Sequence, residues 1–279
     1  MSLVPGATLL AEAAAAGRAL AAFNVITLEH AQAVTAGAAA VGAPVMLQVS
    51  QNAVAYHLGE LAPLAAALRA LAEAAPTPVA LHLDHVTEEA LLRQAPAVGF
   101  GSVMFDASRL PYADNVAATA EAVRFGHAHG LLVEAELGQV GGKPADAHTP
   151  GVRTDPDEAA AFVRETGVDA LAVAVGSRHA MRERTARLDL ELIGRLRAAA
   201  GVPLVLHGSS GVPDEELRRA VAAGMTKINT GTALNRAMTG ALRAWLPAHP
   251  EQTDPRPGLR AGREAMTAVV RHLLTVLAG

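Results

Sequence analysis

Eight short apolar runs, separated by longer helical segments, constrain the fold of this chain more than any other feature. Runs this apolar are typical of strands that are buried on both faces, as in a parallel sheet. Strands that alternate with helices indicate β–α–β crossovers, and eight such units in 279 residues predict a closed (β/α)8 TIM barrel of the α/β class. The runs lie at residues 19–25, 43–50, 78–84, 101–106, 131–137, 169–176, 202–208 and 225–230.

The rest of the chain agrees with one barrel domain over residues 1–279, since no Pro/Gly/Ser-rich linker divides it. A doubly wound open sheet is the structural alternative, but it normally carries a Gly-rich turn after its first strand, which AFNVITLEH lacks. Asp155 and Gly167 predict the start and end of one helix, and residues 212–224 repeat this pattern. The Pro-rich segment 249–262 predicts a loop, followed by a final amphipathic helix.

Composition excludes several classes of protein. The net charge is −4, and the 23 Lys and Arg residues are scattered, so no nucleic-acid partner is expected. The chain has no cysteine, so any metal must be held by His, Asp or Glu. The first twenty residues contain Glu12 and Arg18 and predict a helix rather than a signal peptide. No run reaches the roughly 18 apolar residues of a membrane span, and we expect a cytoplasmic protein.

Nearly every predicted strand ends in a polar residue. The carboxyl ends of the strands of such a barrel converge on one face, where active sites lie. One polar strand end is usually a capped loop residue, but eight together favour a functional site. These residues are Asn24, Ser50, Asp84 with His85, Asp106, Glu136, His179, His207 and Asn229.

Three of these strand ends carry histidines, His85, His179 and His207. Three protein ligands leave the fourth zinc position open, which is the catalytic arrangement, so the pattern predicts a catalytic zinc site. The alternative is three unrelated histidines among the 11 in the chain. Five others are expected at the surface and three stay ambiguous. The first group is His127, His129, His148, His249 and His272, and the second is His30, His57 and His82.

Carboxylates accompany the histidines. Asp84 adjoins His85, and because adjacent strand residues point to opposite sides, both reach the site only if the strand ends there. Asp84 suits general acid/base chemistry, or else orients a histidine. Glu134 and Glu136 share one face of their strand, where a carboxylate is costly unless it is paired or bound to metal.

Two Gly-rich turns, at residues 207–211 and 229–232, follow the last two predicted strands. Backbone N–H groups in such turns bind phosphate, and phosphate sites after these strands are common in this fold. Together with the motifs HLDH, VEAELG and LHGSSG, they complete a pattern that runs nearly end to end. In this pattern the chain resembles the class II, zinc-dependent ketose-bisphosphate aldolases, which include the fructose- and tagatose-bisphosphate enzymes.

The resemblance implies a role for each matching residue. Asp84 would move the proton on the substrate hydroxyl, the three histidines would bind Zn2+, and Glu136 would hold a second or displaced metal. The further ion is a second divalent or a monovalent cation. Arg256 would reach the far phosphate, often from a neighbouring subunit, so a homodimer or homotetramer is expected. The remaining substrate-binding positions are Asn24, Ser50, Ala180, Gly208, Ser209, Ser210, Asn229, Thr230, Gly231 and Thr232.

Some positions depart from the family pattern. Pro144 stands where a glutamate usually moves the C3 proton, and Asp146 is the nearest acid, with His148 second. Residues 138–152 are rich in Gly and Pro and are expected to form a mobile lid. Gly231 replaces the usual Asp, Asn or Ala, and Ala180 and Arg182 replace the usual Gly and Lys. These departures bear on which substrate is used more than on the class of reaction.

The function implied is the cleavage of a ketose phosphate, or its synthesis, from dihydroxyacetone phosphate and an aldehyde such as glyceraldehyde 3-phosphate. The chain has only two lysines, Lys143 and Lys227, so a covalent mechanism through a lysine amine is less favoured than the zinc mechanism. A metal-dependent hydrolase on this fold and a non-catalytic paralogue that binds metal and sugar phosphate are the alternatives.

Overall fold

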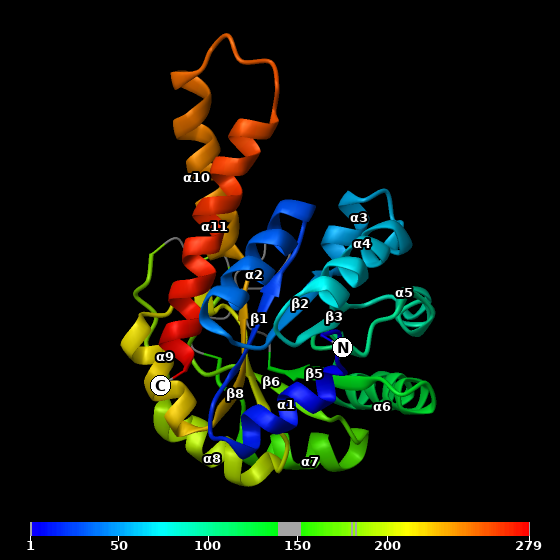
Figure 1. The fold of residues 1–279 in the computed structure, drawn as a ribbon. Coiled ribbons are helices and arrows are strands. Elements are labelled where there is room, and N and C mark those ends of the chain that lie inside the picture. The colour runs from blue at the N-terminus through cyan, green and yellow to red at the C-terminus, as the bar shows by residue number, and fades with distance from the viewer. Residues whose placement is uncertain (1, 139–151, 180, 182, 279) are drawn as a thin grey trace.

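The computed structural model describes residues 2–138, 152–179, 181 and 183–278. Its eight strands pair in sequence order, all parallel, and close into a barrel surrounded by helices (Figure 1). The predicted (β/α)8 barrel is therefore confirmed. The strands are β1 (Leu20–Asn24), β2 (Val45–Ser50), β3 (Val79–Val86), β4 (Ser102–Phe105), β5 (Leu132–Leu137), β6 (Ala170–Val173), β7 (Leu204–Leu206) and β8 (Met225–Thr230).

Helices connect the strands and also cover the base of the barrel. They are α1 (Gly6–Ala15), α2 (Leu28–Val41), α3 (Gln51–Tyr56), α4 (Leu61–Ala74), α5 (Glu89–Leu92), α6 (Tyr112–Ala128), α7 (Pro156–Thr166), α8 (Leu190–Ala200), α9 (Asp214–Ala223), α10 (Thr232–Ala248) and α11 (Arg256–Leu277), with short 3-10 turns η1 (Pro96–Val98) and η2 (Ser209–Gly211). None of the described helices is both long and apolar enough to cross a membrane.

The helix signals read from the sequence hold in most places. Asp155 caps α7 by accepting from the backbone N–H groups of Asp157 and Glu158, at 2.9 and 3.1 Å, and Gly167 ends the helix in a left-handed conformation. In α9 the capping position is taken by Pro213, without a side-chain cap.

The loop predicted for residues 249–262 is partly wrong, because α11 already begins at Arg256. Proline is tolerated in the first turn of a helix, because the backbone N–H groups there make no hydrogen bond within the helix. Gly258 serves close packing rather than a turn, since a Cβ there would lie 3.1 Å from a ring carbon of Trp245 in α10. The two helices thus pack as a long antiparallel arm that rises above the barrel (Figure 1).

The barrel interior divides into an apolar floor and a polar upper part. Leu9 and Leu10 of α1 close the N-terminal end against inward-facing side chains such as Leu20, Met46 and Val205. Outward-facing strand residues join the large core beneath the helices. Because every second strand residue faces inward, residues two and four positions further along stack above this floor. The polar residues of the upper part lie at those positions.

Candidate active site

Four side chains converge at the C-terminal mouth of the barrel. His85, Glu136, His179 and His207 each offer one ligand atom, and these atoms all lie within 4.8 Å of one another. The three imidazole centroids are 4.8–5.7 Å apart, in edge-to-face pairs. The structure thus brings together the three histidines and the glutamate that the sequence selected.

Backbone geometry explains how Asp84 and His85 both reach the mouth. The strand does not end at Asp84, as the sequence argument required, but continues to Val86. Instead, the register with β4 shifts between Leu83 and Val86, and His85 adopts a left-handed conformation with φ of 50°. Such a φ is uncommon in a residue other than glycine and persists where the surroundings impose it, often at functional sites. This local twist turns two consecutive side chains toward one site.

Carboxylates hold two of the rings from behind. His85 Nδ1 lies 2.7 Å from Oδ2 of Asp106, whose Oδ1 accepts from the Ser108 hydroxyl. His207 Nε2 lies 3.1 Å from Oε1 of Glu134. A ring nitrogen bound to a carboxylate donates its proton there, which leaves the opposite nitrogen as a lone-pair ligand. The opposite nitrogen of His207, Nδ1, lies 3.3 Å from Oε2 of Glu136.

The donor set fits a divalent metal. His207 Nδ1 is buried and makes no hydrogen bond within the described part of the chain. Burial lowers the pKa of His207, but the neighbouring carboxylates of Glu134 and Glu136 outweigh burial and raise the pKa to about 9. The site is therefore rich in negative charge, which a divalent cation would compensate. Three imidazoles and one carboxylate are ligands that zinc takes.

Asp84 lies in a separate hydrogen-bonded chain. The Asn24 amide donates to Asp84 Oδ2 at 2.9 Å, and Gln48 donates to Asn24 Oδ1 at 2.9 Å. Burial raises the pKa of Asp84, but electrostatic interaction with His85, His207 and Lys227 outweighs burial and holds the pKa below its usual value. Asp84 Oδ1 is buried and has no hydrogen-bond partner among the described residues. It is an ionised carboxylate with one oxygen available.

Comparison with known proteins agrees with this geometry. Residues 4–279 match the family model of class II fructose-bisphosphate aldolases. The chain belongs to this family. It is 31% identical to the YdjI aldolase of Escherichia coli K12, with a TM-score of 0.86 over 99% of this chain and 97% of that one. The fold also matches a fructose-bisphosphate aldolase of Campylobacter jejuni, at 24% identity and a TM-score of 0.83, over 99% of this chain and 96% of that one.

In this aldolase-family chain, the two Gly-rich turns lie side by side. Ser209 donates its hydroxyl proton to the carbonyl of Asn229, and the Ser210 hydroxyl accepts from the N–H of Ala233 at 3.0 Å. Asn229 Oδ1 is buried with no hydrogen-bond partner in the described part of the chain. The turns therefore meet at the first turn of α10, where backbone N–H groups attract anions. Gly208, Thr230, Gly231 and Thr232 belong to the same two turns.

Other predicted site residues lie apart or outside the described residues. Ser50 accepts from the N–H of Ala53 and caps α3. Arg256 lies at the tip of the arm, paired with Asp254, and its side chain is 82% exposed. Since α10 has 17 residues and spans about 25 Å, Arg256 is remote from its own barrel mouth. The positions Ala180, Asp146, His148 and Pro144 lie outside the described residues.

The sequence argument missed Gln48, which is fully buried and orients Asn24. The available signal was a polar residue two positions before Ser50 in an apolar strand. Of the ambiguous histidines, His82 faces the barrel interior, where Nδ1 contacts the Ser102 hydroxyl at 2.9 Å. Burial and the charge of Lys227 lower the pKa of His82 to about 3, so it is neutral.

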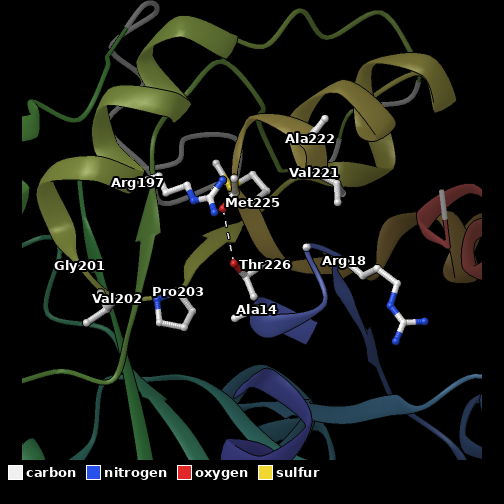
Figure 2. Close-up of a pocket in the computed structure, with 12 residues that line it drawn as sticks. Ala14, Arg18, Arg197, Gly201, Val202, Pro203, Val221, Ala222, Met225 and Thr226 are labelled. Carbon is white, nitrogen blue, oxygen red and sulfur yellow. Dashed lines mark hydrogen bonds between the residues drawn. The ribbon is translucent and has the colours of Figure 1, made fainter. Parts of the chain in front are cut away.

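A pocket of about 300 Å³ lies at the opposite end of the barrel (Figure 2). It is lined by Arg18, Arg197 and Met225 among others, near the N-terminal ends of β7 and β8. Residues at the C-terminal ends of α1, α8 and α9 also line it. This pocket is separate from the candidate active site.

Gly231 gives a first test of the Asn24–Asp84 contact. A Cβ at position 231 would lie 2.9 Å from Asn24 Oδ1, so Gly231→Ala displaces the amide that holds Asp84. We expect turnover to fall about tenfold, because small misplacements at an active site cost up to about 10² in rate. Metal content should not change. Gly240→Ala is the control, since nothing lies within 4 Å of its added Cβ; equal activity of both variants would contradict the expectation.

Proposed function

We propose that this protein is a zinc-dependent aldolase that cleaves a ketose phosphate, or forms it from dihydroxyacetone phosphate and an aldehyde. The observation that carries the proposal is the position of Asp84. Asp84 precedes the candidate ligand His85 in β3 and interacts electrostatically with His85 and His207, and its Oδ1 has no hydrogen-bond partner among the described residues. Family membership favours an aldolase over a metal-dependent hydrolase on the same fold.

His85, His179 and His207 would hold the zinc ion, and Glu136 would be a fourth or alternative ligand, also for a second cation. When bound, zinc supplies Lewis-acid polarisation of the substrate ketone. The chain contributes the orientation of each imidazole through Asp106 and Glu134.

Asp84 would act as the general acid/base. In cleavage, its ionised carboxylate takes the proton of the C4 hydroxyl, and in condensation it returns that proton to the aldehyde oxygen. The hydrogen bond from Asn24 fixes one oxygen and so aims the other. Because the pKa of Asp84 is held below its usual value, the carboxylate is ionised at neutral pH.

The two turns after β7 and β8 would bind the dihydroxyacetone phosphate half. Backbone N–H groups at the first turn of α10 would face its phosphate, and Asn229 Oδ1 offers a hydrogen-bond acceptor. Arg256 would serve the site of another subunit, since it projects on the arm away from its own barrel mouth. This role for Arg256 would require a homodimer or homotetramer.

A substrate panel tests the proposed function. The purified protein is supplied with zinc and then with ketose mono- and bisphosphates, and release of dihydroxyacetone phosphate is measured with and without a chelator. We expect cleavage of at least one ketose phosphate that the chelator abolishes and added zinc restores. Tight binding of these compounds without cleavage would instead support the non-catalytic paralogue, which the altered segment GGKPADAH motivates.

Removal of the C3 proton of dihydroxyacetone phosphate needs its own base. Asp146 is the first candidate and His148 the second, since the usual glutamate position is Pro144. We expect Asp146→Ala to slow exchange of this proton with solvent, measured by NMR without an aldehyde. Exchange as fast as in the parent protein would remove Asp146 from the role, and intact exchange in both Asp146→Ala and His148→Ala would place the base in the barrel mouth.

A further inference from the structure

A buried ion pair lies directly beneath the candidate metal site. Lys227 Nζ in β8 is 2.7 Å from Glu134 Oε2 in β5, and the two side chains are 1% and 0% exposed. Burying two charges costs several kcal/mol for each ion, and such pairs are often no more stable than apolar replacements. A contribution to the stability of the fold is therefore a weak explanation for the presence of this ion pair. The charge of Lys227 helps to lower the pKa of Asp84, but neither the acid/base role nor phosphate binding as proposed above needs its contact with Glu134.

The geometry connects the pair to the metal site through one residue. Glu134 divides its two oxygens, with Oε2 on Lys227 and Oε1 on His207 Nε2 at 3.1 Å. A lysine ammonium has only donors, so it fixes Glu134 as an acceptor on that side. The carboxylate plane then sets the direction in which Oε1 meets the His207 ring. With Nε2 so engaged, Nδ1 faces Glu136, 3.3 Å away.

We propose that Lys227 is a positioning residue that, through Glu134, holds His207 in the orientation and Nε2–H tautomer in which Nδ1 is the metal ligand. This inference rests on the proposed metal site. Lys227 is buried in the barrel interior, and its ammonium group donates to Glu134 Oε2. Its proposed effect on His207 passes through this carboxylate. Groups that orient metal ligands in this way are usually worth 10- to 100-fold in metal affinity or activity.

The test measures zinc affinity rather than turnover. Lys227→Met keeps the chain length and removes the charge, and Glu134→Gln keeps the shape and removes one acceptor. We expect each to weaken zinc binding about 10- to 100-fold in competition with a chromogenic chelator. In the double variant the effects should not add, because both act on one contact. Glu216→Gln is the matched control, a buried carboxylate-to-amide change at an ion pair with Arg219 in α9 that should leave zinc affinity unchanged.

A purely structural ion pair gives a different result. Lys227→Met would then lower the melting temperature of the metal-free protein but bind zinc as tightly as the parent, which would overturn the inference. If the parent protein itself fails to bind zinc, the proposed function fails instead. NMR of 15N-histidine-labelled, zinc-loaded parent protein needs no substitution. We expect His207 to carry its proton on Nε2, and a proton on Nδ1 would refute the assignment even if the variants do not fold.

Discussion

We expect alanine in place of His85, His179 or His207 to abolish retention of zinc. Each ring contributes one nitrogen to a group whose ligand atoms lie within 4.8 Å of one another, and two of the rings are held by carboxylates behind them. A metal with three protein nitrogens that loses one keeps too few fixed ligands, and the pre-oriented carboxylates cannot replace it. We expect the parent protein to keep about one zinc ion per chain after dialysis against a weak chelator, and each variant to lose it.

His249→Ala is the control for this experiment. His249 lies at the end of α10, stacked on Trp245 with a centroid distance of 4.1 Å and away from the barrel mouth. It should retain zinc and activity at parent levels. A histidine variant that retains one tightly bound zinc ion would contradict the assignment of that residue as a ligand. Circular dichroism on each variant separates loss of metal from loss of fold.

We expect Asp84→Asn to reduce turnover by roughly 10²–10⁴, the usual contribution of a general acid/base group. The amide has the shape of the carboxylate, and its oxygen can still accept from Asn24, so the fold and the metal site should persist. What is lost is the ionised oxygen that accepts a proton. We therefore expect unchanged zinc content, a similar KM and a greatly reduced kcat on whichever ketose phosphate the panel identifies.

Near-parent turnover of Asp84→Asn would move the acid/base role elsewhere. Glu134 and Glu136, which share one face of β5, are the next candidates, and the structure favours Glu136. Glu134 has both oxygens engaged, by Lys227 and His207, and has no exposed surface. Burial raises the pKa of Glu134, but the charge of Lys227 and the hydrogen bond of His207 outweigh it and lower the pKa to about 2. Glu136 would then be tested first by the same isosteric substitution.

The amino-acid sequence by itself determined the barrel and the set of residues at its mouth. Apolar runs that alternate with helices leave few topologies, because parallel strands need crossovers and bury both faces. Once a closed barrel follows, every strand end points to one rim, so His85, His179 and His207 could be grouped without knowing any distance between them. Capping residues such as Asp155 and Gly167 could also be predicted from the sequence, because a helix cap depends only on residues near that end of the helix.

Only the tertiary structure decided which side chains work together. Lys227 and Glu134 are 93 residues apart, and their contact depends on the register of barrel closure, which no local pattern encodes. The left-handed conformation of His85 is likewise imposed by the register shift against β4. The start of α11 was misjudged because the segment 249–262 is rich in Pro, whereas proline is tolerated in the first turn of a helix and Gly258 lets α10 and α11 pack closely. In each case a contact between segments distant in the chain outweighs a local preference.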